Sequence, residues 1–213
     1  MRLFVIGSLL VMCTAPALSQ SSDLEILLKD LKSGGYIVVF RHGATDESQR
    51  DAYPFKFDDM SAQRQLSEEG RETARQIGEA FSTLGIPVGV VYSSRLHRAV
   101  ETARLIGRKE VTLKDTLTDS GAGNLSSMAN PTGKNAQAGK SLRALTDVPP
   151  EQSSNNLVVT HKTNITDAFG KDFSDIGEGE AVVLRFKAGS SSSTFVRRIL
   201  AKDWTTGRSS DVH

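Results

Sequence analysis

The sequence contains a single cysteine, Cys13, among its 213 residues. A disulfide needs two cysteines, so cross-links within the chain are excluded and the fold must be held together by packing alone. Histidine is also scarce: there are four, and none stands in a His-x-x-x-His or similar metal-ligand spacing. We therefore expect no metal site.

Neither sign of charge is in excess. The chain carries 26 Lys and Arg against 25 Asp and Glu, a formal net charge of +1. Such a balance provides no long-range attraction for nucleic acid or for an anionic membrane surface. We expect no nucleic-acid partner, and recognition of an anion has to come from a local group of residues.

Long hydrophobic runs are missing too, apart from one stretch near the start. Residues 3–12 are largely apolar but too few to span a bilayer, Arg2 precedes them, and small residues follow at 15–19. This pattern predicts a secretory signal peptide, residues 1–19, that is cleaved near Ser19. The mature protein is then periplasmic or secreted and has no membrane span. A membrane anchor that stays on the protein is the less favoured alternative.

The remaining residues, 20–213, are long enough for a single domain, with 207–213 as a loose tail. Short buried strands are predicted at 36–40, 88–92, 110–114, 156–160 and, as a hairpin, 181–187 and 194–199. Helices are predicted at 23–32, from a cap at Ser67 to Gly85, from a cap at Ser93-Ser94 to Leu105, and at 136–145. This alternation predicts an α/β three-layer sandwich, with a mostly parallel central sheet and helices on both faces.

Basic side chains follow three of the predicted strands. Arg41 and His42 come directly after the first strand, His161 follows the strand at 156–160, and Arg98 comes shortly after Ser93-Ser94. The carboxyl ends of parallel strands meet at one edge of a sheet, where open α/β sheets bind their ligands. We expect these side chains to lie close together at that edge.

Two histidines and two arginines without a matching group of acids suit a compact dianion such as a phosphoryl group. Arginine presents a planar fork of donors to phosphate oxygens. A helix that starts at Ser93-Ser94 adds backbone N–H groups and the positive end of its dipole. A neutral imidazole can attack phosphorus while a second imidazole binds the transferring oxygens.

Three segments, residues 40–43, 93–103 and 158–161, resemble the histidine phosphatase superfamily, the phosphoglycerate-mutase-like group in its smaller branch. Residues 65–71 are similar to that family's Leu-Ser/Thr-x-x-Gly stretch, so the resemblance covers most of 20–213. It implies a covalent mechanism through phosphohistidine without a cofactor.

The resemblance also implies roles for single residues. His42 matches the family's nucleophile, and Arg41, Arg98 and His161 match its phosphate-binding residues. Thr45 matches a small hydroxyl position that touches the phosphate, and Gly43 belongs to the same binding turn. Arg95 does not match the family's arginine.

The acid that protonates the leaving oxygen is where the sequence departs from the family pattern. The nearest counterpart of the family's Leu-x-Glu is Asp119, and Lys162 stands where the larger branch has an acid after its histidine. Asp119 is therefore the candidate acid, with Asp46 and Glu47 as reserves. Asn164 either supports the phosphate site or caps the helix toward Phe169, and we favour the cap.

These observations predict a phosphatase that hydrolyses a phosphomonoester, or a related phosphoryl bond, of a small phosphorylated substrate. A mutase is disfavoured because the leader directs the chain out of the compartment of glycolysis. The alternative is a module of the same fold that binds phosphorylated ligands and is impaired in catalysis.

Overall fold

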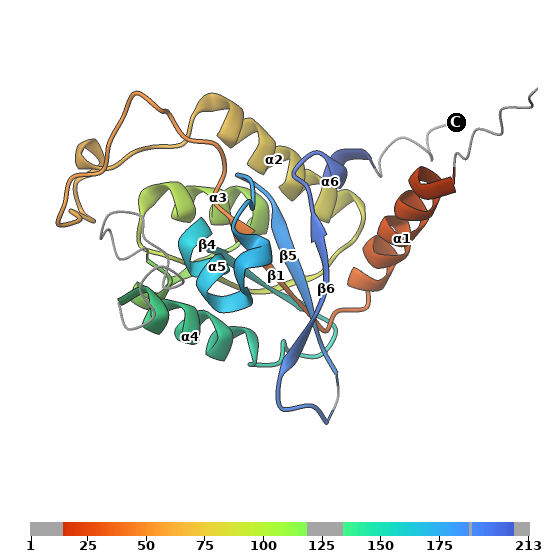
Figure 1. The fold of residues 1–213 in the computed structure, drawn as a ribbon. Coiled ribbons are helices and arrows are strands. Elements are labelled where there is room, and N and C mark those ends of the chain that lie inside the picture. The colour runs from red at the N-terminus through yellow and green to blue at the C-terminus, as the bar shows by residue number, and fades with distance from the viewer. Residues whose placement is uncertain (1–14, 119–133, 188, 207–213) are drawn as a thin grey trace, which may run out of the picture.

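A six-stranded sheet runs through the fold in the order β3-β2-β4-β1-β5-β6. Figure 1 shows the sheet with helices packed around it. In this computed structural model, residues 15–118, 134–187 and 189–206 are described. The strands are β1 (Tyr36–Arg41), β2 (Val88–Ser93), β3 (Val111–Leu113), β4 (Asn155–Thr160), β5 (Ala181–Phe186) and β6 (Ser193–Ile199). The helices are α1 (Ala15–Leu31), α2 (Glu68–Thr83), α3 (His97–Gly107), α4 (Lys134–Thr146), α5 (Lys162–Phe169) and α6 (Asp203–Thr206). Short 3-10 turns are η1 (Met60–Ala62), η2 (Asp115–Leu117) and η3 (Lys171–Phe173).

Four of the strands are parallel and two are not. β2 pairs in parallel with β3 and with β4, and β4 pairs in parallel with β1. β5 is antiparallel to β1, and β6 returns antiparallel to β5 as the predicted hairpin. The predicted fold class, a mostly parallel sheet between helical layers, is confirmed. The carboxyl ends of β1, β2 and β4 therefore meet at one edge.

The two faces of the sheet carry separate hydrophobic cores because side chains alternate along each strand. From β1, Val38 and Phe40 pack on one face, against α1, α2, α3 and α6. Ile37 and Val39 pack on the other, against α4 and α5. Burial on both faces explains why the β1 sequence is a continuous hydrophobic run instead of an alternating one.

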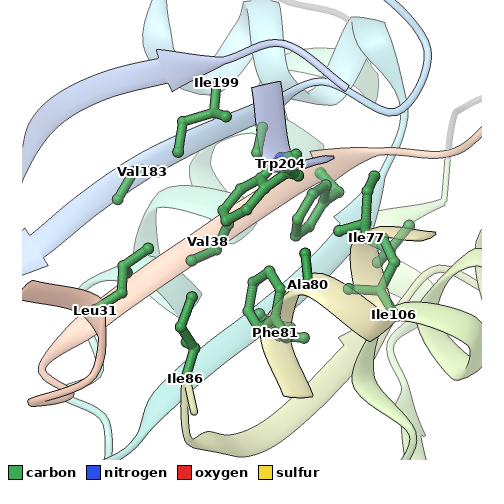
Figure 2. Close-up of a cluster of buried hydrophobic side chains, with 14 of the residues drawn as sticks. Leu31, Val38, Ile77, Ala80, Phe81, Ile86, Ile106, Val183, Ile199 and Trp204 are labelled. Atoms are coloured by element: carbon green, nitrogen blue, oxygen red, sulfur yellow. The ribbon is translucent and has the colours of Figure 1, made fainter. Parts of the chain in front are cut away.

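Trp204 completes the first of these cores (Figure 2). Its ring is fully buried and lies 5.0 Å from the ring of Phe81 in α2 and 5.7 Å from Phe40, measured between centroids. The short helix α6 that carries it lies beyond the last predicted strand. The sequence pattern did not predict this helix, because one turn shows no periodicity.

Of the three predicted helix caps, the structure has one. Ser67 caps α2 as predicted, since its Oγ accepts from the backbone N–H of Gly70 at 3.1 Å. α3 does not start at the predicted cap: Ser93 ends β2, and the helix begins at His97 without a side-chain cap. The Asn164 cap is also wrong, because His161 is the N-cap of α5 and Asn164 lies buried inside the helix.

A buried amide fixes the sheet at the edge opposite these strand ends. Asn155, the first residue of β4, donates through Nδ2 to the carbonyl oxygens of Leu31 (2.8 Å) and Pro87 (2.9 Å). Its Oδ1 accepts from the backbone N–H of Tyr36 at 3.1 Å. One side chain thus joins the end of α1 and the starts of β1, β2 and β4.

No helix within the described parts of the chain has both the length and the apolar content that a membrane crossing requires.

Candidate active site

The two predicted histidines meet where β1 and β4 end. The parallel register pairs Arg41 with Thr160, so the next residue of each strand, His42 and His161, lies beside the other. The backbone N–H of His42 donates to the Thr160 carbonyl at 3.0 Å, which continues the pairing. Both imidazoles are buried, and their ring centroids are 5.2 Å apart. The sheet itself therefore creates a facing pair of imidazoles.

His42 is held in one tautomer. Its Nδ1 lies 2.8 Å from the carbonyl oxygen of Gly43, and a carbonyl can only accept, so Nδ1 carries the proton. Burial, followed by the positive charge of Arg98, lowers the pKa of His42 well below its usual 6.5. The ring is therefore neutral at pH 7, and the lone pair of Nε2 is available to attack an electrophile.

His161 is held by Ser94, the residue after β2. Ser94 Oγ and His161 Nε2 are 2.8 Å apart, and both side chains are buried. Burial lowers the pKa of His161 well below 6.5 as well, with Arg98 as the next cause. Ser94 thus contacts the site directly as a partner of the second imidazole, instead of capping a helix as the sequence predicts.

Arg98 reaches the histidine pair from the first turn of α3. It is 3% exposed, and its positive charge lowers the pKa of both imidazoles. Its Nη1 donates to Asp51 Oδ1 at 2.9 Å. Arg95, by contrast, lies 4.4 Å over the ring of Phe57.

Arg41, the last residue of β1, precedes His42, and its charge also acts on the pKa of both imidazoles. Its Nη1 donates to the Ile176 carbonyl at 2.8 Å and its Nη2 to Glu178 Oε1 at 3.1 Å. Thr45 Oγ1 lies 3.4 Å from the same carboxylate oxygen. Glu178 therefore links two of the predicted phosphate-binding residues.

The turn after His42 is fixed by close packing on α2 and α3. The Gly43 N–H donates to Thr102 Oγ1 at 3.0 Å. A Cβ at Gly70 would lie 2.1 Å from the Ala44 carbonyl oxygen, so only glycine lets α2 approach the turn this closely. Gly43 and Thr45 are the neighbours of Ala44 in this turn.

Residues 44–66, the long segment after this turn, bring further groups to the site that sequence reasoning missed. Asp51 binds Arg98, and the charge of Arg64 lowers the pKa of His42, His161 and Arg41. The length and polarity of the segment indicated a functional loop, but no periodicity singled out these two residues.

The candidate acid, Asp119, lies outside the described residues. Of the reserves, Asp46 is engaged within its own loop: it accepts from Ser48 N and Oγ, and these bonds lower its pKa. Glu47 is exposed. Among the described residues, no group of three His, Cys, Asp or Glu side chains is placed to hold a metal ion.

Solved structures of known phosphatases share this fold. The protein histidine phosphatase SixA complexed with tungstate is 18% identical with a TM-score of 0.54, over 79% of this chain and 98% of that one. A phosphoserine phosphatase mutant from Entamoeba histolytica in complex with phosphoserine is 17% identical with a TM-score of 0.53, over 79% and 98%. Mycobacterial glucosyl-3-phosphoglycerate phosphatase is 18% identical with a TM-score of 0.55, over 78% and 98%.

Sequence comparison is decisive at the level of the family. No curated protein matches the chain closely enough to count as a relative. The model of the histidine phosphatase superfamily (branch 1) matches residues 37–155, more than half of the sequence. This span contains Arg41, His42 and Arg98, and membership of the family supports phosphatase activity. The chain belongs to the histidine phosphatase superfamily, branch 1.

Proposed function

We propose that this protein hydrolyses a phosphomonoester, or a related phosphoryl bond, through a phosphohistidine formed on His42. The observation that carries the proposal is the state of His42: a buried, neutral imidazole whose proton is fixed on Nδ1. The ring lies beside a second imidazole, and the positive charges of Arg98 and Arg41 act on it. This is the arrangement that in-line transfer of a phosphoryl group to nitrogen requires.

In the first step, His42 Nε2 attacks phosphorus, the N–P bond forms and the bond to the leaving oxygen breaks. Negative charge develops on the equatorial oxygens, where the guanidinium groups of Arg41 and Arg98 stabilise it. When Ser94 Oγ donates to His161 Nε2, the proton of this neutral ring lies on Nδ1 and can donate to the same oxygens.

In the second step, water attacks the phosphorus and the N–P bond breaks. The electron pair returns to Nε2 of His42, and inorganic phosphate leaves. The leaving oxygen of the first step takes a proton from an acid, which the second step returns when that group accepts a proton from the water. Asp119 remains our candidate for this acid.

The substrate is proposed to be a small phosphorylated molecule. Three structures of the same fold name such ligands: phosphoserine, 3-phosphoglyceric acid and, in the name of an enzyme, glucosyl-3-phosphoglycerate. The leader-like residues 1–19 support export, so we propose that the reaction takes place in the periplasm or outside the cell.

The decisive experiment compares wild type, His42→Ala and His97→Ala with an aryl phosphate substrate at neutral pH. His97 serves as the control because it lies in α3 outside the histidine pair. We expect His42→Ala to lose at least about 1,000-fold in turnover, and His97→Ala to stay within a few-fold of wild type. Quenching in alkaline detergent during turnover should trap a phosphoenzyme that is stable in alkali and lost in acid, in the wild type and in His97→Ala but not in His42→Ala.

Two results would overturn the proposal. One is turnover that survives in His42→Ala. The other is a folded wild type that binds inorganic phosphate but turns over no substrate, which is the behaviour of a binding module.

A further inference from the structure

Arg64 lies in a stretch that is paired with the turn after His42. Thr45 and Leu66 form an antiparallel bridge. The backbone N–H of Asp46 donates to the carbonyl of Gln65 at 3.1 Å, and that of Ser67 donates to Ala44 at 3.0 Å. This pairing brings Arg64, which is far from His42 in sequence, to the side of the nucleophile's own turn.

One carboxylate oxygen fixes Arg64 relative to Arg98. Asp51 Oδ1 accepts from the backbone N–H of Arg64 at 2.9 Å and from Nη1 of Arg98 at 2.9 Å. The position of the Arg64 backbone and the position of the Arg98 side chain therefore depend on the same atom. The Asp51 side chain is 21% exposed, so these bonds are partly shielded from water.

The guanidinium group of Arg64 has no partner of its own in the described part of the chain. Its Nε is buried there without a hydrogen bond, and it forms no ion pair with any described carboxylate. By contrast, Arg41 forms an ion pair with Glu178, and Arg98 forms one with Asp51. A partly buried cation without a counter-charge is costly, so its retention points to a ligand that supplies the charge.

The electrostatic surroundings of Arg64 agree with this position. Its positive charge contributes to the lowered pKa of His42, of His161 and of Arg41, so it acts on both imidazoles and on a neighbouring guanidinium. The three guanidinium groups thus carry three positive charges, whereas the carboxylates of Glu178 and Asp51 supply two negative charges and both imidazoles are neutral. An anion that enters this site relieves the excess of positive charge.

We propose that Arg64 is a third phosphate-binding arginine, which donates from its guanidinium group to the phosphoryl oxygens of the substrate alongside Arg41 and Arg98. The inference rests on the proposed function and adds a binding residue to the same site. Arg41 gives both terminal nitrogens to Ile176 and Glu178, and Arg98 gives one to Asp51. Of these three arginines, Arg64 has the most donors without a partner in the described part of the chain.

The test uses Arg64→Ala and Arg64→Lys, with Arg50→Ala as the matched control. Arg50 lies in the same loop, is exposed and donates to carbonyl oxygens of that loop, those of Glu47 and Gln49. Calorimetry with inorganic phosphate should show binding about 10- to 100-fold weaker in Arg64→Ala. kcat/KM for an aryl phosphate should fall at least as far, Arg64→Lys should recover part of both losses, and Arg50→Ala should stay within about twofold.

Thermal melting without phosphate separates binding from folding. Loss of an unpaired cation should leave Arg64→Ala at least as stable as Arg50→Ala, while phosphate should raise its melting temperature less. If Arg64→Ala instead melts lower without phosphate, Arg64 is structural and the inference fails. It also fails if Arg64→Ala binds phosphate as Arg50→Ala does.

These outcomes are distinct from those for the proposed function. A wild type that loses activity on His42→Ala while Arg64→Ala behaves as the control overturns only the inference. A wild type that binds phosphate without turnover overturns only the hydrolase, because the binding arm still measures Arg64. A wild type that does neither overturns both.

Discussion

The candidate active site has two halves that are held in different ways. His42 and His161 are direct continuations of β1 and β4, and hydrogen bonds of the sheet set their separation. Asp51, Arg64 and Glu178 come from connecting segments and are linked to the site through hydrogen bonds of the Asp51 and Glu178 carboxylates. The reacting nitrogen of His42 therefore lies in the strand-end half, which His42 and His161 form. The charges of Asp51, Arg64 and Glu178 lie in the loop half.

This difference teaches how one scaffold can keep a reaction while changing its substrate. Groups on strands of a sheet are positioned more accurately than groups on loops, and covalent chemistry tolerates little misplacement. Charge–charge attraction falls off gradually with distance, so a loop is sufficient to supply it. We expect substitutions in the strand-end half to abolish turnover, and substitutions in the loop half to reduce it.

The largest effect in this comparison should come from His161→Ala. Removing a donor to the transition-state oxygens typically costs 100- to 1,000-fold, and we expect a loss in kcat/KM of about 1,000-fold. Steady-state kinetics with an aryl phosphate measures it, and Ser94→Ala should lose less because His161 remains. A loss below about tenfold in His161→Ala would remove this residue from the chemistry.

The next largest effect should come from Gly70→Ala, which breaks the packing behind the nucleophile's turn. Its Cβ would meet the Ala44 carbonyl at 2.1 Å, and we expect a loss of about 3 kcal/mol in the free energy of unfolding. Gly78→Ala is the control, because its Cβ would meet the Leu105 carbonyl at 2.2 Å, away from the site. Urea unfolding should show similar losses in both variants, but only Gly70→Ala should lose activity in conditions where the protein is folded.

A smaller effect is expected from Asp51→Asn in the loop half. The amide keeps the shape but weakens the hold on Arg98 and on the Arg64 backbone, so kcat should fall about 30-fold. KM should change less than about threefold, because the lost negative charge favours phosphate. Asp115→Asn is the control, since its pairing with Arg95 is exposed at 3.7 Å and contributes little. A pure rise in KM would contradict the positioning role of Asp51.

The smallest effect concerns stability and pH. The pKa of both histidines is lowered in the folded state, so below about pH 6.5 the unfolded chain binds more protons. Stability is full above that pH and is lost as the pH falls toward the folded-state pKa values. Each histidine contributes about 1.4 kcal/mol per pH unit at most in that window. Urea titrations from pH 7.5 to 5.5 should show a shallower loss in His42→Gln, and an equal slope would contradict the buried, neutral state.

Much of the strand-end half could be predicted from the sequence. The buried runs before Arg41 and His161 identify strands, and parallel neighbours place their ends together. Arg98 required the resemblance to a family as well. The loop half could not be predicted, because Asp51 and Arg98 are 47 residues apart, and Arg41 and Glu178 are 137 apart. Ser94 shows the same limit: its hydroxyl is typical of a local helix cap, but a partner 67 residues away binds it instead.

Asn155, at the edge of the sheet opposite the histidine pair, helps to set the distance between the two imidazoles. Its three hydrogen bonds fix where β4 begins relative to β1, and six residues later the same strand delivers His161. A slip of β4 by one residue would carry that imidazole about 3.3 Å along the strand and turn it to the opposite face. The spacing of the two rings is thus inherited from an amide at the opposite end of the strand from both histidines, and a substitution there can change the active site without altering His42 or His161.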